Sequence, residues 1–404
     1  MPLIIRRSLL LLLCMILLWR MLSVNMTQYL STMPPTFAAD WPIYNTERVL
    51  AQAANLAASN PERAYVMVSH VAQNHPLNAQ AWVMLGLLME GKGQAKQAQQ
   101  LMRWVATMFP NRPDTQLQLG NFWARQSNLL SAMRAWGRSI DMQPALRKAL
   151  YPQLLTLVEQ PKNFVAARQA FAEPSAWADG FFRYAVNNAA YMETLKLIYY
   201  ARLQTKTPLT DEIRRDYLGR LLRESMWTDA YFVWLNGLSA SQQLALGHIY
   251  DGGFEQEVHA EGFSWRLAEV EGLTVRPQQI QGASGQYALH IAFKGAKRQP
   301  SLLGSQILLL DAGPYAFSGR VKLETLSAVN GLRWELVCLT AASTVLATSQ
   351  NFIDKMHWQS FNLPIEIPAD CPAQTLRLIL DPVDAKRTNL SGSLWFDDLK
   401  ISNQ

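Results

Sequence analysis

Carboxylates are the residues of this 404-residue chain that could support acid–base chemistry. Glu255, Glu257, Asp397 and Asp398 could lie close together, and a glycoside hydrolase needs two such groups about 5–10 Å apart in a cleft. Asp397 and Asp398 are neighbours on a predicted strand, so their side chains point to opposite faces. The chain has no GxSxG, GxxxxGK, HExxH or GxGxxG motif, and its six histidines lack metal-ligand spacing. The sequence therefore predicts no catalytic residues and a protein that is not an enzyme.

The chain has three cysteines, which limits its possible disulfides and metal sites. Zinc binding is not expected, because no CxxC motif or Cys/His cluster exists. Cys14 lies in an apolar segment near the N-terminus. Cys338 and Cys371 lie in segments predicted as strands and could form a disulfide in an oxidising compartment. The alternative is a pair of buried free thiols.

Short side chains recur at a fixed interval in the N-terminal half of the chain. Ala64, Ala98 and Ala132 stand 34 residues apart, and a proline follows each of them after twelve residues. Small residues let facing helices approach closely, and a proline ends the second helix of each pair because it has no N–H to donate. A period of this length predicts stacked helical hairpins, which we expect to form an α-solenoid over residues 45–245.

The repeat units also carry a family pattern. The second unit contains Trp82-x-x-Leu85-Gly86-x-x-Met89, and the third contains Leu119-Gly120-x-x-Trp123. This pattern resembles the tetratricopeptide repeat, with Met89 where the family has an aromatic residue. Stacked hairpins present a concave surface to a protein partner. The candidate partner-binding residues in that groove are Asn78, Gln80, Gln116, Asn121 and Arg125.

The N-terminus has the pattern of a targeting segment. Arg6 and Arg7 precede the uncharged apolar run from Leu9 to Trp19, and no small-x-small cleavage site follows. We therefore expect a signal anchor or transmembrane segment over 1–30 and a proline-containing linker over 31–44. A cleaved signal peptide is the alternative.

The sequence pattern changes near Gly247. Short alternating apolar runs follow, such as Tyr315–Leu323, and glycines and prolines separate them. Nine or ten short strands at this spacing predict an all-β sandwich over 246–404. The expected fold class is therefore multidomain, α then β.

Both ends of the predicted sandwich carry a signature. Residues 251–255 read Asp-Gly-Gly-Phe-Glu, and residues 394–399 read Leu-Trp-Phe-Asp-Asp-Leu. This pair resembles the jelly-roll modules of the carbohydrate-binding and galactose-binding-like superfamily. The resemblance implies a structural calcium held by Glu255 and Asp398, and a metal-free carboxylate pair is the alternative. The aromatic candidates for glycan contact are Trp265, Tyr287, Trp334 and Trp358.

Composition and domain order narrow the function. The net charge of +6 contains no long Lys/Arg block, so a nucleic-acid partner is not expected. The order of anchor, repeats and jelly roll resembles membrane-anchored proteins of bacterial exopolysaccharide biosynthesis. The resemblance implies a single-pass inner-membrane protein that is mostly periplasmic, recruits protein partners of the envelope polysaccharide machinery and could contact polysaccharide. The alternatives are a pure protein–protein scaffold and a polysaccharide-modifying hydrolase.

Overall fold

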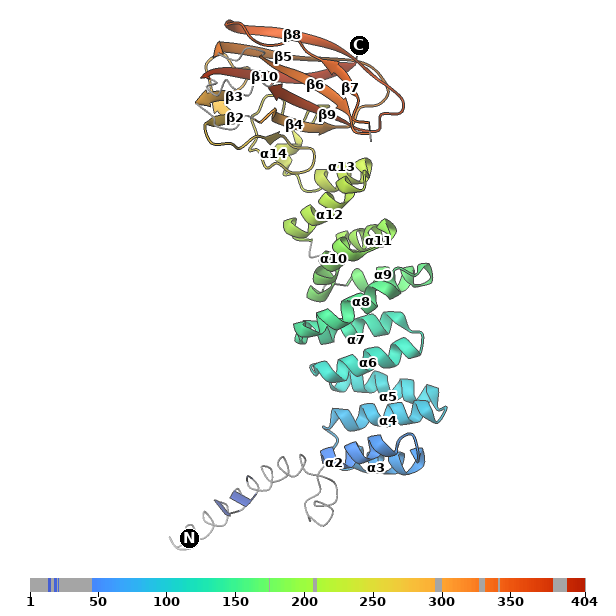
Figure 1. Ribbon diagram of the computed structural model, residues 1–404. Coiled ribbons are helices and arrows are strands. Elements are labelled where there is room, and N and C mark those ends of the chain that lie inside the picture. Colours follow the sequence, from blue (N-terminus) through green and yellow to red (C-terminus); the bar gives the residue numbers. More distant parts are fainter. Residues whose placement is uncertain are drawn as a thin grey trace. The chain divides into compact units, whose positions relative to one another are not determined.

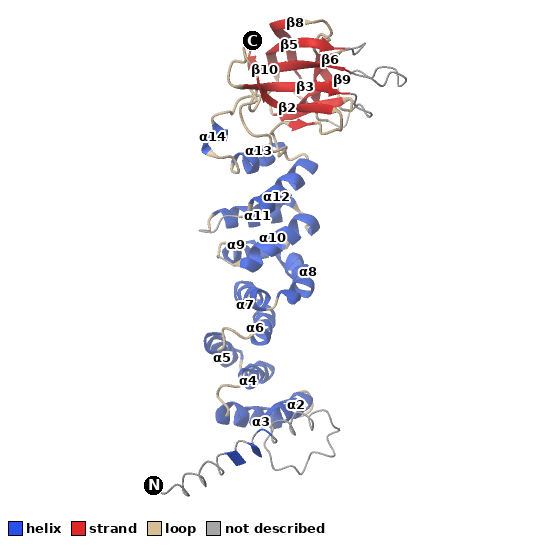
Figure 2. Ribbon diagram, turned by 90° about the vertical axis from the view of Figure 1, so that its left-hand side faces the viewer, coloured by secondary structure: helices blue, strands red, loops and turns tan. Residues whose placement is uncertain are grey.

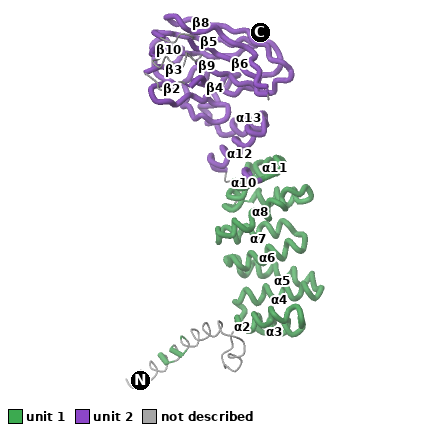
Figure 3. The backbone as a smooth tube through the Cα atoms, in the orientation of Figure 1, with its two compact units in different colours: residues 1–185, 189–207 green, residues 186–188, 208–404 purple. Residues whose placement is uncertain are grey.

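The computed structural model describes residues 14–15, 18–19, 21, 46–173, 175–205, 209–294, 300–326, 331–340, 342–380 and 391–403 (Figure 1). Most of the predicted anchor and all of the predicted linker lie outside these residues. Within them, we find no helix that is both long and apolar enough to span a bilayer. The chain divides into two compact units, residues 1–185 with 189–207, and residues 186–188 with 208–404 (Figure 3).

The first unit is helical. Its α-helices in chain order are α2 (Thr46–Leu56), α3 (Pro61–Asn74), α4 (Ala79–Gly91), α5 (Ala95–Met108), α6 (Pro113–Arg125), α7 (Leu129–Met142), α8 (Arg147–Val158), α9 (Phe164–Phe171), α10 (Ala176–Asn188) and α11 (Met192–Leu203). The last three residues of α10, 186–188, group with the second unit. Consecutive helices pack in pairs, α2 on α3, α4 on α5 and α6 on α7.

The 34-residue period of the sequence is also the period of the helices. Helices α3, α5 and α7 begin at residues 61, 95 and 129, which are 34 residues apart. They end at residues 74, 108 and 142, each two residues before a proline, as the spacing predicted. The helical hairpins are therefore present, and the assignment to the tetratricopeptide family stays a prediction from the resemblance.

Small residues are required where these helices cross. Ala64, Ala98 and Ala132 are completely buried. A Cβ atom on Gly120 would lie 2.3 Å from Cδ1 of Trp136, so the indole of α7 occupies the space that a larger residue in α6 would need. Gly86 has the same relation to Met102, at 2.7 Å from Cε. The pattern of glycines and alanines is thus a packing requirement.

The second unit begins with three helices, α12 (Asp211–Arg223), α13 (Trp227–Leu235) and α14 (Ala240–Gln243). The predicted solenoid extends to residue 245, whereas these helices group with the sandwich. The reason is aromatic packing: the Trp234 ring lies 5.1 Å from Tyr250 and 5.6 Å from Phe263, measured between centroids. Apolar periodicity predicts a helix but does not say which neighbour its buried face contacts.

The rest of the second unit is a β-sandwich (Figure 2). Its strands are β1 (Arg266–Leu267), β2 (Leu273–Gln279), β3 (Tyr287–Lys294), β4 (Leu302–Leu308), β5 (Gly313–Leu326), β6 (Leu332–Cys338), β7 (Val345–Thr348), β8 (Met356–Ile367), β9 (Gln374–Leu380) and β10 (Ser391–Asn403). They form two antiparallel five-stranded sheets, in the orders β1-β4-β9-β6-β7 and β2-β3-β10-β5-β8. A disulfide joins Cys338 to Cys371. One apolar core fills the space between the sheets.

The two signature segments meet, as the resemblance implied. The backbone N–H of Leu399 in β10 donates to the carbonyl of Gly252 at 2.9 Å. A Cβ atom on Gly252 would lie only 1.8 Å from the carbonyl oxygen of Leu399. Gly252 therefore allows the opening segment to contact the backbone of the closing strand directly.

Candidate functional site

Side-chain alternation defines a polar outer face on the β2-β3-β10-β5-β8 sheet. In β3, Leu289, Ile291 and Phe293 belong to the core. Since successive side chains of a strand point to opposite faces, His290 and Lys294 lie on the outer face. The side chains on the other face of the same sheet pack in the core and hold the two sheets together. The side chains of the outer face are therefore available for recognition.

Four side chains form a row across this outer face. Arg276 of β2 pairs in register with His290 of β3, and His290 pairs with Trp395 of β10. Trp395 pairs in turn with Lys322 of β5. We call Arg276, His290, Trp395 and Lys322 the cationic row. It joins residues more than 100 positions apart in the sequence, so only the strand register brings them together.

The centre of the cationic row is a stacked pair of rings. The His290 imidazole lies on the Trp395 indole, with centroids 3.9 Å apart and planes inclined by 17°. The indole is only 8% exposed and the imidazole is partly exposed, so the imidazole is the more accessible of the two rings. In the amide orientation that satisfies its neighbours, Gln278 donates to Nδ1 of His290 at 2.8 Å and accepts from Arg276. These contacts fix the plane of the imidazole before any ligand arrives.

One carboxylate lies beside the cationic row. Glu324 accepts hydrogen bonds from Oγ of Ser393 at 2.8 Å and from Nζ of Lys322 at 3.1 Å. These hydrogen bonds hold the pKa of Glu324 below its usual value. Glu324 is therefore a charged partner that positions Lys322.

Protonation of His290 should cost stability. Burial lowers the pKa of His290, Lys294 and Arg276 lower it further, and Glu324 opposes them. As the pH falls below about 6.5, the unfolded chain binds a proton at this position that the folded chain resists. The free energy of unfolding should therefore decrease between pH 7.5 and the lowered pKa. We expect the stability advantage of wild type over His290→Gln to shrink from pH 7.5 to pH 5.5 in urea titrations. Equal advantages at both pH values would contradict this, and exposed His357→Gln is the matched control.

A second cluster adjoins the row at the 280–286 loop. The Arg320 guanidinium lies 4.9 Å from the centroid of the Trp358 ring. It also donates to Oγ of Ser284 at 2.8 Å and to the carbonyl of Gly282 at 3.0 Å. The Nε1 atoms of Trp358 and Trp395 are buried, and neither has a hydrogen-bond partner among the described residues. An unpaired buried donor costs roughly 1–3 kcal/mol, so each of these two indole N–H groups lowers the stability of the fold.

The carboxylates of the signature segments are already hydrogen-bonded. Asp397 is fully buried and accepts from the backbone N–H groups of Ser284 (2.7 Å) and Asp398 (2.8 Å). Burial raises the pKa of Asp397. Asp398 accepts from the Ser284 hydroxyl, and Oε1 of Glu255 accepts from two backbone N–H groups, those of Gln286 (2.8 Å) and Tyr287 (2.9 Å). These groups fasten the 280–286 loop to both ends of the sandwich.

The carboxylates of Glu255 and Asp398 do not fit a calcium ion in this arrangement, because hydrogen-bond donors already occupy them. Glu255 faces amide donors, and Asp398 faces a hydroxyl donor and the Arg320 guanidinium at 3.8 Å. Within the described part of the chain, no group of three or more acidic, histidine or cysteine side chains could hold a metal ion. A structural calcium at Glu255 and Asp398 stays a prediction of the resemblance.

The four aromatic candidates for glycan contact lie in different places. Trp265 and Trp334 are 1% and 0% exposed, and their rings pack against each other in the core, so no sugar can reach them. Tyr287 begins β3 on the core side and is partly exposed. Only Trp358 lies on the outer face, beneath Arg320. Aromatic residues in strands indicate burial more often than recognition.

The candidate groove residues of the helical unit are also separated. Asn78 and Gln80 line a cavity of about 660 Å³ together with Arg112, Asp114 and Gln118. Gln116 is 1% exposed and donates to the carbonyl of Phe109, so it is not a groove residue. Asn121 accepts from Nε1 of Trp136, and Arg125 pairs with Glu90 at 2.8 Å. Asn121 therefore links the two helices of one hairpin, α6 and α7, and Arg125 links α6 to α4 of the preceding hairpin.

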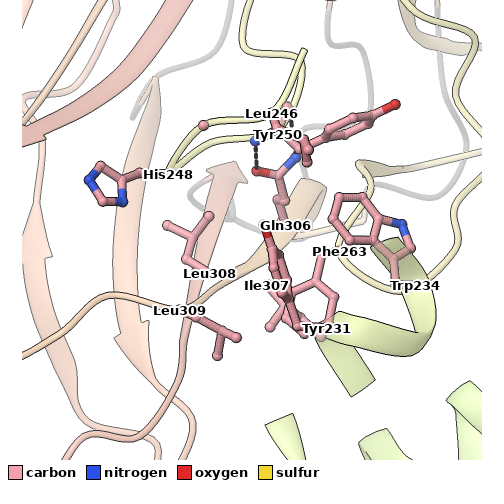
Figure 4. A pocket seen from close by; sticks show the side chains of 11 residues that line it. Tyr231, Trp234, Leu246, His248, Tyr250, Phe263, Gln306, Ile307, Leu308 and Leu309 are labelled. Carbon is pink, nitrogen blue, oxygen red and sulfur yellow. Dashed lines mark hydrogen bonds between the residues drawn. The ribbon is translucent and has the colours of Figure 1, made fainter. Parts of the chain in front are cut away.

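A second cavity, of about 540 Å³, lies between α13 and β4 (Figure 4). Tyr231, Trp234 and Phe263 form one wall. The Gln306 amide accepts from the backbone N–H of Tyr250 and donates to its carbonyl, at 3.0 and 2.8 Å. The cavity thus has an aromatic lining whose central amide is already paired.

Four residues of this face are not among the predicted site residues: Arg276, His290, Arg320 and Lys322. A signal did exist, because the alternation in residues 287–294 places His290 and Lys294 opposite the apolar positions. The stacking on Trp395 and the pairing with Arg276 had no sequence signal, since both depend on register.

No protein-family model and no curated protein matches the sequence. Solved structures with similarity include one described as "CBM4 structure and function", at TM-score 0.30 and 16% identity over 39% of this chain and 99% of that chain. Another is the CBM22-1 xylan-binding domain of a Paenibacillus barcinonensis protein, at TM-score 0.27 and 17% identity over 37% and 90%. A third is TmCBM61 in complex with β-1,4-galactotriose, at TM-score 0.27 and 14% identity over 39% and 99%. TM-scores this low carry no functional conclusion for this chain.

Proposed function

We propose that this chain is a non-enzymatic adaptor whose β-sandwich binds a polysaccharide and whose helical hairpins recruit a protein. The cationic row carries the proposal. It places one cation, Arg276 or Lys322, on each side of the stacked His290–Trp395 ring pair, in positions that the register of four strands fixes. Flat rings flanked by polar groups in fixed positions are suited to a sugar ring, which has apolar and hydroxyl-bearing parts.

Each part of the face has a distinct task in this proposal. The imidazole of His290, supported by Trp395, offers a flat surface to the C–H groups of one sugar ring. Arg276 and Lys322 donate hydrogen bonds to the oxygens of the same or the next sugar unit. Because the strand register fixes their backbone positions, a sugar binds without the cost of ordering a loop.

The same geometry supports the absence of catalysis. A general acid or base must be free to contact its substrate. Asp397 is fully buried, and Asp398 and Glu255 are engaged by Ser284 and by backbone N–H groups. These carboxylates therefore support the loop beside the face.

Protein recruitment is assigned to the helical unit. The cavity that contains Asn78 and Gln80 mixes Arg112 with Glu47 and Asp114. It presents both charges and amides to a polar peptide segment. Anchoring in a bacterial inner membrane, a periplasmic location and a role in exopolysaccharide biosynthesis or export are the setting that we propose from the domain-order resemblance.

Affinity electrophoresis of the full chain through gels containing neutral or acidic polysaccharides tests the proposal. We expect retardation by at least one polysaccharide and an affinity loss of about tenfold or more in His290→Ala, which removes the outward ring. His259→Ala, an exposed histidine outside the sheet, is the matched control and should migrate like wild type. Unretarded migration in every gel would favour the pure protein scaffold.

A further inference from the structure

We propose that the outer face of the β2-β3-β10-β5-β8 sheet selects an anionic polysaccharide, one that carries carboxylates on its sugar units. This inference rests on the proposed function and names the ligand class for the same face. Its basis is the positive charge around His290, which is larger than the single negative charge of Glu324 can neutralise.

Positive charge exceeds negative charge around the ring pair. Arg276 and Lys294 lie on the same face as His290, and Lys322 follows Trp395 across the sheet. Glu324, the acidic group that acts on His290, forms its ion pair with Lys322, which leaves Arg276 and Lys294 uncompensated by it. Glu324 is occupied by Lys322 and Ser393. Arg276 and Lys294 are exposed, and neither has a carboxylate within 4 Å among the described residues.

The side chains on the sheet surface between Arg276 and Lys294 are short. The next row across the sheet pairs Thr274 with Ala292 and Ala292 with Ser393. These short side chains leave Arg276 and Lys294 as the longer groups beside His290. A polymer lying along the sheet can therefore bring a carboxylate to the Arg276 guanidinium, which binds carboxylates through two parallel hydrogen bonds.

A neutral polysaccharide would meet the same cations without compensation. Covering Arg276 and Lys294 with uncharged sugar removes water from both charges, and hydroxyl groups replace that hydration only in part. A carboxylate supplies the missing charge.

Two pairs of polymers that differ in charge test the inference with the full chain. Carboxymethylcellulose is compared with hydroxyethylcellulose, and polygalacturonate with its methyl ester. We expect at least tenfold tighter binding to the acidic member of one pair at 50 mM NaCl, and weakening at 200 mM. Arg276→Gln and Lys294→Gln should each reduce that affinity by about fivefold or more, and Arg276→Lys should restore part of it. Lys148→Gln, which removes the same charge from an exposed position in α8, should bind like wild type.

The outcomes separate this inference from the proposed function. Equal or tighter binding of the neutral polymers, lost in His290→Ala, would overturn the anionic preference and retain glycan binding. Inorganic polyphosphate that competes as well as the acidic polymer would also overturn it, because the face would then be a general anion site. Absence of binding to all four polymers would overturn both.

Discussion

Alanine at position 252 is expected to cost the second unit about 3 kcal/mol of stability or more. The added Cβ would lie 1.8 Å from the carbonyl oxygen of Leu399, and the N–H of that same residue donates to the Gly252 carbonyl. Backbone atoms of a central strand cannot move aside as a flexible side chain can, so the clash must separate the opening segment from β10. Hydrogen exchange followed by mass spectrometry should show amides of β10 and β5 exchanging about 100-fold faster, since each 1.4 kcal/mol is a factor of ten.

The neighbouring glycine provides the control for this substitution. A Cβ atom on Gly253 would meet Cγ of Glu255 at 3.8 Å and Oδ1 of Asp397 at 4.0 Å, which are ordinary contacts. Gly253→Ala should therefore exchange much like wild type. If Gly252→Ala also left the exchange of β10 unchanged, the contact between the two ends would not be a determinant of the sandwich. Glycan binding should fall together with protection, because the cationic row includes Trp395 of β10.

The helical hairpins were predictable because their determinants are local and periodic. Ala98 and the proline at 110 act within one hairpin, so their spacing translates directly into the end of α5 at Met108. The strands were predictable for the same reason, as in the alternation of Tyr315 to Leu323. The grouping of α12 with the sandwich was not predictable in this way. It depends on contacts such as that of Trp234 with Tyr250, and no periodic pattern in the sequence indicates them.

The location of the candidate site could not be predicted from the sequence of any single strand, because it depends on how the strands pair. Trp334 and Trp358 are the same residue type in strands of similar composition, yet one is fully buried and the other lies under Arg320. The face of each follows from strand register, and β8 has an irregularity beside Trp358 where Val321 pairs with Gln359 but Leu323 pairs with Met356. A shift of one residue exchanges the two faces of a strand. The stacking on Trp395 that makes His290 a site residue has no sequence signal, because it depends on the pairing of β3 with β10.

Removal of the disulfide is the second change with a large expected effect. Cys338 and Cys371 are both buried, and their bond closes a loop with a sequence separation of 33 residues, between the end of β6 and the start of β9. Restricting the unfolded chain over a loop of this length stabilises the folded state by about 4 kcal/mol in the chain-entropy treatment. We expect the Cys338→Ala/Cys371→Ala variant to lose about that much in urea titrations, and wild type in dithiothreitol to lose a similar amount. Dithiothreitol should not affect the double variant further, which separates loss of the bond from other effects of the reductant.

A thiol count decides between the bridged and free forms that the sequence left open. Under denaturing conditions without reductant, Ellman's reagent should detect one thiol per chain, that of Cys14, if the pair is bridged. Three thiols would show that both cysteines are free and would remove the stability argument. Because disulfides persist in oxidising compartments, a bridged pair also favours the extracytoplasmic location that polysaccharide binding requires in our proposal. A reduced pair in protein isolated from its native compartment would contradict that location, even if the cationic row still bound glycan in solution.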